Sequence, residues 1–148
     1  MSSKRLAPQR RRPASVDSAA DRASAILEID LDAVQRNWRL LQGKVGKAVQ
    51  CAAVVKADGY GLGAGRVAKA LLAAGCKTFF VATLGEAEEL RGLLAGATIY
   101  VLAGLQQDTA PVYRQFDLRP VLNSADEIDM LTEGASGNGK NIAACIAV

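Results

Sequence analysis

Short apolar segments alternate with stretches of helical spacing along most of the chain, and this alternation constrains the fold more than any other feature. Predicted strands cover 25–29, 49–55, 78–82, 98–102, 118–122 and 142–148, with helical or helix-capping patterns between them. Strands and helices that alternate at this interval are typical of a repeated β-α unit. They predict a mostly parallel sheet, either an open doubly wound sheet or a (β/α)8 barrel.

Three of the predicted helices start with recognisable capping residues. Asp30 precedes apolar residues at helical spacing, and Thr83 with Glu86 and Ser124 with Glu127 form capping boxes. Two further helices are expected at about 65–74 and 111–116. Counted from the strand at 49–55, the pattern contains four β-α units and a fifth strand.

A closed barrel needs eight units and about 250 residues. The body of this chain, residues 25–148, has room for half of them, and the sequence stops inside an apolar segment. We expect an α/β fold that is the first half of a (β/α)8 barrel, belonging to a longer protein. A complete small open sheet is the alternative.

Basic residues are concentrated at the N-terminus. Residues 1–22 carry a net charge of +4, whereas the whole chain carries +3, so the remaining residues sum to −1. Because residues 1–24 are polar and show no apolar periodicity, we expect a disordered tail. It has no aromatic residues and no apolar signal segment, and no run of about 18 apolar residues exists to span a bilayer. We therefore expect a cytoplasmic protein with no nucleic-acid and no membrane partner.

The chain has no histidine, and its three cysteines show no C-x-x-C spacing. The lack of histidine excludes His-dependent triads and most zinc or non-haem iron sites within this chain. The cysteine spacing excludes a disulfide-dense secreted scaffold and suits a reducing compartment. No metal site is expected.

One segment, Val54–Gly65, carries the candidate chemistry. A buried strand ends on Lys56, and four glycines alternate up to the next helix. The carboxyl ends of parallel strands are where α/β folds place their sites, and a partly desolvated lysine amine there can form a Schiff base. Tyr60 offers a phenol that can donate to a phosphate oxygen.

Two plainer interpretations of this segment stay open at this point. A lysine after a strand is most often a solvated strand end. Gly59–Ala64 also matches the loose dinucleotide fingerprint G-x-G-x-x-A, although Lys-Ala-Asp separates it from the strand and no acidic residue ends the following strand.

The segment Val54-Val55-Lys56-Ala57-Asp58-Gly59-Tyr60-Gly61 closely resembles the lysine motif of alanine racemases, which are fold-type III pyridoxal-phosphate enzymes. Residues 29–37, 80–87 and 120–123 are similar to that family's opening strand and helix, second β-α unit and fourth strand. Leu62 departs from the family pattern, which usually has histidine there. The resemblance covers residues 25–148, the N-terminal part of such an enzyme.

The resemblance implies pyridoxal 5'-phosphate as cofactor. Lys56 would be its covalent anchor and the base acting on D-alanine, and Tyr60 would contact the phosphate. Val54 and Leu102 would line the ring or serve as ordinary core. Tyr100 and Tyr113 do not match family site positions and are expected to be structural.

The resemblance also implies what the parent protein does: it interconverts L- and D-alanine for peptidoglycan precursors, as a homodimer. Its second base and remaining cofactor contacts would lie beyond residue 148, so we expect this chain to be inactive alone. A racemase of broader specificity, a non-enzymatic pyridoxal-phosphate-binding barrel and a nucleotide-binding open α/β domain are the alternatives.

Overall fold

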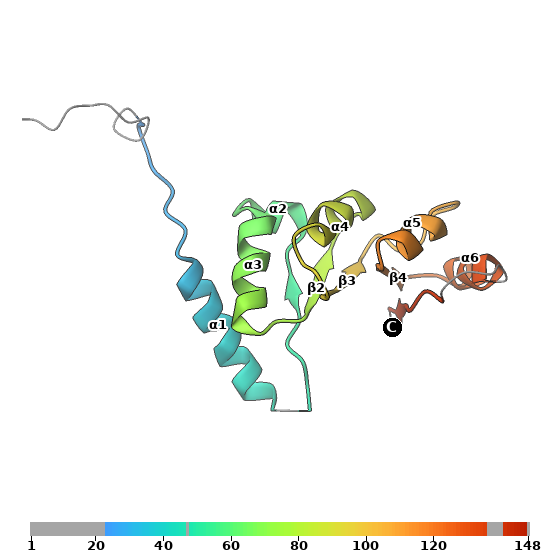
Figure 1. Ribbon diagram of the computed structural model, residues 1–148, viewed down its shortest axis with the longest axis horizontal. Coiled ribbons are helices and arrows are strands. Elements are labelled where there is room, and N and C mark those ends of the chain that lie inside the picture. The colour runs from blue at the N-terminus through green and yellow to red at the C-terminus, as the bar shows by residue number, and fades with distance from the viewer. Residues whose placement is uncertain (1–22, 47, 136–140, 148) are drawn as a thin grey trace, which may run out of the picture.

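The computed structural model describes residues 23–46, 48–135 and 141–147 (Figure 1). Apart from Ala23 and Ser24, the tail predicted to be disordered lies outside these residues. In chain order the elements are α1 (Leu31–Val45), β1 (Ala53–Val54), α2 (Lys56–Tyr60), α3 (Ala64–Ala74), β2 (Thr78–Val81), α4 (Leu84–Arg91), β3 (Thr98–Val101), α5 (Ala110–Gln115), β4 (Arg119–Leu122), α6 (Ala125–Ala135) and β5 (Cys145–Ile146).

The five strands form one parallel sheet in the order β1-β2-β3-β4-β5, which is the order of the sequence. Figure 1 shows α3, α4, α5 and α6 following one another along the sheet in the same order. A doubly wound sheet reverses its strand order at a switch point, whereas a barrel adds each strand beside the last. The sequential order therefore decides between the two predicted arrangements, and the structure is part of a (β/α)8 barrel.

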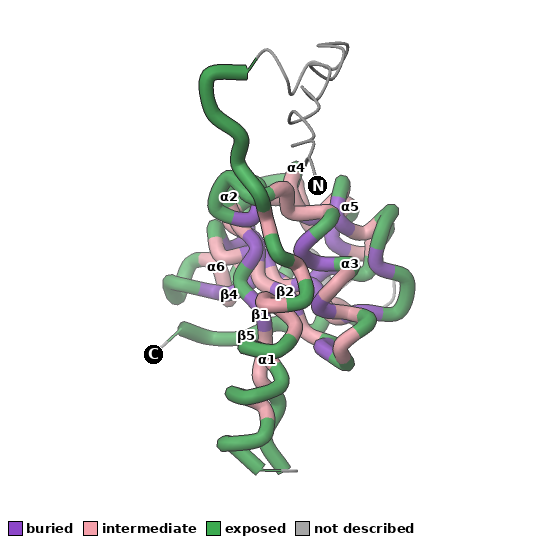
Figure 2. The backbone as a smooth tube through the Cα atoms, turned by 90° about the vertical axis from the view of Figure 1, so that its left-hand side faces the viewer, coloured by how far each residue is buried: buried purple, intermediate pink, exposed green. Residues whose placement is uncertain are grey.

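Burial alternates along the central strands, so the sheet has one covered face and one open face. Phe79, Val81, Ile99 and Val101 are buried in a core that also contains helix residues, while their neighbours in the strands are half-buried. Apolar side chains packed between strands and helices supply the main favourable free energy of the fold. Figure 2 shows the buried residues gathered in this layer.

Helix α1 begins as the sequence predicts and packs on α3. The Asp30 side chain accepts a hydrogen bond from the Ala33 amide at 2.8 Å. Trp38 packs against the core, and its indole N–H donates to the Cys51 carbonyl at 2.9 Å. No helix within the described ranges is long and apolar enough to cross a membrane.

The strand predicted at 25–29 is wrong. These residues take no part in the sheet, and Ile26 and Leu27 are 70% and 76% exposed (Figure 2). A strand exists only where a neighbour supplies the ladder of hydrogen bonds, and no described segment lies beside this one as a partner strand. The strands predicted at 49–55 and 142–148 are also shorter in the structure, at Ala53–Val54 and Cys145–Ile146.

Candidate functional site

Lys56 lies where the sequence predicts, after β1 and the buried Val55. Val55 is 1% exposed, and its amide donates to the Phe80 carbonyl at 2.9 Å, which extends the pairing with β2 by one residue. The lysine therefore leaves the sheet at its carboxyl edge, which is the functional end of a (β/α)8 barrel.

Residues 56–63, which we call the lysine turn, contain a left-handed helical turn. The φ angles of Ala57, Asp58, Gly59 and Tyr60 are 52°, 51°, 64° and 58°. The Gly61 amide donates to the Ala57 carbonyl at 3.0 Å, which closes the turn. Each non-glycine residue in this conformation costs about 1–2 kcal/mol, so surrounding contacts must hold the turn. Strain of this kind is concentrated at functional sites.

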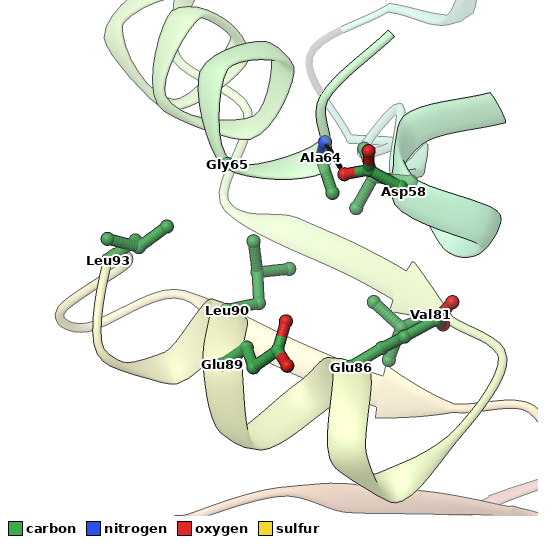
Figure 3. A pocket seen from close by; sticks show the side chains of 9 residues that line it. Asp58, Ala64, Gly65, Val81, Glu86, Glu89, Leu90 and Leu93 are labelled. Atoms are coloured by element: carbon green, nitrogen blue, oxygen red, sulfur yellow. Dashed lines mark hydrogen bonds between the residues drawn. The ribbon is translucent and has the colours of Figure 1, made fainter. Parts of the chain in front are cut away.

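Asp58 ties the lysine turn to the start of α3. Its Oδ1 accepts a hydrogen bond from the Ala64 amide at 2.8 Å (Figure 3). Gly59 packs so closely against this point that a Cβ there would lie 3.1 Å from the Ala64 amide nitrogen. The Asp58 carboxylate thus occupies the N-terminus of α3, and this is the position that a bound pyrophosphate would need. The dinucleotide interpretation of Gly59–Ala64 does not fit this arrangement.

The Lys56 side chain is half-buried, and within the described part of the chain its amine makes no hydrogen bond or ion pair. Tyr60 is on the same turn and is 62% exposed. The structure thus brings both predicted residues to the same edge of the sheet, without joining them by a hydrogen bond. Both polar groups are available to a ligand.

The open face of the sheet beside the lysine turn is apolar and aromatic. Val54 pairs in register with Phe80, and Phe80 pairs with Tyr100. The Phe80 and Tyr100 rings stack at 4.9 Å, and the Arg119 guanidinium lies 5.7 Å from the centre of the Tyr100 ring. Val54 is 45% exposed on this face, which leaves it available to a flat ligand.

The other predicted positions have plainer surroundings. Leu102 is half-buried and follows β3. The Tyr113 ring is buried, and its hydroxyl donates to the Gly104 carbonyl at 2.6 Å. Burial and the nearby Glu127 charge raise the pKa of Tyr113 to about 12, so it stays a neutral donor. Both tyrosines expected to be structural, Tyr100 and Tyr113, have packing partners.

The donor set fits pyridoxal phosphate. A free primary amine suits the aldehyde, an apolar strand face suits the ring, and an exposed phenol hydroxyl suits a phosphate oxygen. Among the residues the structure describes, no three histidine, cysteine or acidic side chains are arranged to hold a metal ion.

A family model described as "Alanine racemase, N-terminal domain" matches residues 29–148. The chain belongs to this family. It is 47% identical over 131 residues to the alanine racemase of Methylobacterium nodulans, covering 88% of this chain and 35% of that protein. The chain thus spans about a third of the length of the curated relatives it matches.

Solved structures of racemases have the same fold. Alanine racemase from Bartonella henselae, crystallised with covalently bound pyridoxal phosphate, is 40% identical and superposes with a TM-score of 0.70, covering 76% of this chain and 32% of that one. A histidine racemase from Leuconostoc mesenteroides superposes with a TM-score of 0.68 at 24% identity, covering 77% of this chain and 30% of that one. At that identity the likeness shows the fold alone.

For this member of the alanine racemase family, sequence reasoning missed one residue of the site. Glu86 was assigned only to the capping box with Thr83, and that box is present. Its Oε1 also accepts a hydrogen bond from the Ala57 amide at 2.8 Å, in the lysine turn. Glu86 and Ala57 are 29 positions apart in the sequence, so no local pattern could reveal this contact.

Proposed function

We propose that this chain is the N-terminal barrel portion of an alanine racemase that carries pyridoxal phosphate on Lys56 and interconverts L- and D-alanine. The observation that carries the proposal is the Lys56 amine, unpaired within the described residues and placed at the carboxyl end of β1. Support also comes from relatives named alanine racemase at 43–48% identity.

Pyridoxal phosphate, when bound, draws electrons away from the substrate's α-carbon and so makes its hydrogen acidic. Lys56 would hold the cofactor through its side-chain amine. The same amine, when it is not bonded to the cofactor, would accept or return the α-proton on one face of the substrate, the face used for D-alanine. The Tyr60 hydroxyl would donate to a phosphate oxygen, and Val54 would pack beside the ring.

Racemisation also needs a base on the opposite face, because one group cannot serve both faces efficiently. Apart from Tyr60, which we assign to the phosphate, the tyrosines of the chain do not suit this role, since Tyr100 stacks on Phe80 and Tyr113 is buried. We therefore propose that the second base comes from another region, contributed by the partner in a homodimer. On this proposal the 148-residue chain is inactive alone, and its parent works in the cytoplasm and supplies D-alanine for peptidoglycan.

Borohydride trapping tests the assignment of Lys56. The purified chain is incubated with pyridoxal phosphate, whose aldehyde condenses with an amine and releases water; borohydride then reduces the C=N bond to a stable secondary amine. Peptide mapping should find the label at Lys56. Lys56→Arg should abolish this label, whereas Lys77→Arg, which changes an exposed lysine before β2, should leave it unchanged. Labels spread evenly over the lysines would overturn the proposal.

A further inference from the structure

The Glu86 carboxylate joins two neighbouring strand ends. Its Oε1 accepts the hydrogen bond from the Ala57 amide at 2.8 Å, and its Oε2 accepts one from the Ala82 amide at 2.7 Å. The Thr83 amide also donates to Oε2, at 3.4 Å. Figure 3 shows the Glu86 side chain reaching from the start of α4 past Val81, at the end of β2. One charged group thus connects the lysine turn to the following β-α unit.

A helix cap alone does not require the bond to Ala57. In a capping box the glutamate accepts from the backbone at its own helix start, and Oε2 of Glu86 already does so. The fourth unit contains the same arrangement, in which Ser124 Oγ accepts from the Glu127 amide at 3.2 Å and Glu127 Oε2 accepts from the Asn123 amide at 2.9 Å. The Glu127 carboxylate also lies against Gly104, in the turn after β3, but among the described residues it accepts no hydrogen bond from that turn. The hydrogen bond to a neighbouring turn is therefore particular to Glu86.

The bonded amide belongs to the peptide that carries Lys56. A peptide unit is planar, so the Lys56 Cα and the Ala57 N–H lie in one rigid plane. The chain changes from φ −126° at Val55 to φ 52° at Ala57 across this point. A charge-assisted hydrogen bond at the Ala57 N–H fixes that plane at the point where φ changes from negative to positive values. It thereby fixes the direction in which the Lys56 side chain leaves the backbone.

We infer that Glu86 is a positioning residue for Lys56, acting through the Lys56–Ala57 peptide and not by contact with the amine. This inference rests on the proposed attachment of pyridoxal phosphate to Lys56. Glu86 holds the left-handed lysine turn in the conformation that presents the amine to the cofactor aldehyde. The capping of α4 is a separate task of the same carboxylate.

Glu86→Gln tests this role, because Ala57 and Ala82 donate to different oxygens of Glu86 and glutamine replaces one of those oxygens with an NH2 group, which cannot accept a hydrogen bond. Borohydride trapping at increasing pyridoxal-phosphate concentrations measures labelling at Lys56 against Lys69 and Lys77 in the same sample. We expect the half-saturating concentration at Lys56 to rise roughly tenfold, the cost of one lost bond to a charged group. Amide hydrogen exchange at Ala57 should quicken by a similar factor.

Two control variants identify the cause. Glu127→Gln alters the matched capping box of α6, and Thr83→Ala weakens the cap of α4 while leaving the Glu86 carboxylate in place. Both should retain wild-type labelling at Lys56. Glu86→Asp is the second variant, used if Glu86→Gln folds poorly. It keeps the charge at the helix start but is one methylene too short to reach both amides, so we expect the same rise in the half-saturating concentration at Lys56.

The outcomes are distinct. Selective labelling of Lys56 in the wild type that is unchanged in both Glu86 variants overturns the positioning role and leaves the proposed function standing. Equal losses in Thr83→Ala and Glu86→Gln also overturn it, because helix stability would then explain the effect. Unselective labelling of the wild type overturns the proposed function and this inference together.

Discussion

Arg91 and Asp117 are 26 residues apart in the sequence, and Arg91 Nη2 donates a hydrogen bond to the Asp117 backbone carbonyl at 2.7 Å. The same guanidinium donates to the carbonyls of Leu94, Ala97 and Phe116. One side chain thus holds the loop after α4 and the turn before β4 together. This arrangement needs the planar fork of arginine, whose several N–H groups point in fixed directions.

Arg91→Lys is expected to destabilise the fold by about 1–3 kcal/mol, because a compact ammonium cannot reach all four carbonyls and leaves some of them unpaired. Urea unfolding followed by circular dichroism measures the change as a lower midpoint. Arg66→Lys is the control, since Arg66 is exposed on α3. Equal midpoints for the two variants would contradict the role assigned to Arg91.

Tyr113 makes stability depend on pH in the alkaline range. Its pKa is about 12 in the folded chain and about 10 in an unfolded one, so the unfolded chain loses the proton first. The folded state is therefore stabilised fully below pH ~10, and this contribution is lost as the pH rises towards 12. Unfolding midpoints measured at intervals over this range should fall in the wild type.

Tyr113→Phe removes that titration. Its stability at neutral pH should be lower, because the Gly104 carbonyl loses the hydroxyl that donates to it at 2.6 Å. Its decline between pH 10 and 12 should be shallower than that of the wild type. The difference in phenolate absorbance between the two proteins gives the Tyr113 titration directly. Parallel stability curves would show that Tyr113 is not the group responsible.

Periodicity predicted the repeated β-α units of the parallel sheet because each unit makes its main contacts with the unit beside it, whereas the order of the strands decides between a barrel and an open sheet. The helix expected at about 65–74 is Ala64–Ala74, and the capping box of Thr83 and Glu86 has both of its bonds. The strand predicted at 25–29 was wrong because an apolar pattern shows which residues a segment can bury, but not whether a neighbouring strand is there to pair with it.

The sequence predicted candidate residues for the site but not their backbone conformation. Lys56 and Tyr60 were singled out by residue type, by their place after a strand and by the resemblance to the racemase lysine motif, and their roles toward a cofactor stay predictions. The left-handed conformation at Ala57 and Asp58 was not predictable, because alanine disfavours it and aspartate adopts it only occasionally. Contacts from Glu86 and Ala64, made in three dimensions, hold the turn in place.

Trp38→Phe should loosen the attachment of α1 to β1. Phenylalanine keeps most of the apolar contact but lacks the N–H that donates to the Cys51 carbonyl at 2.9 Å. The expected loss is about 1 kcal/mol, the usual contribution of one such bond. Urea unfolding by circular dichroism measures it. Because Trp38 is the single tryptophan, its fluorescence in the wild type should also report when α1 detaches. An unchanged midpoint in the variant would contradict the contribution of this bond.

Gly59→Ala and Gly61→Ala form a matched pair within the lysine turn. Both glycines have positive φ, at 64° and 81°, so alanine is strained at either position. At Gly59 the added Cβ would also lie 3.1 Å from the backbone of Ala64, whereas at Gly61 it meets nothing within 4 Å. Gly59→Ala should therefore cost more stability than Gly61→Ala, which should lose about 1 kcal/mol through strain alone.

The pair also tests whether the shape of the turn controls the reactivity of Lys56. The clash at Gly59 pushes the turn away from the start of α3, so labelling of Lys56 by pyridoxal phosphate should fall further in Gly59→Ala than in Gly61→Ala. Labelling is measured at a temperature where circular dichroism shows both variants folded. An equal fall in labelling in both variants would mean that backbone strain at either glycine is enough to reduce it, without the clash at Ala64. No fall in either variant would mean that the reactivity of the Lys56 amine does not depend on the shape of the turn.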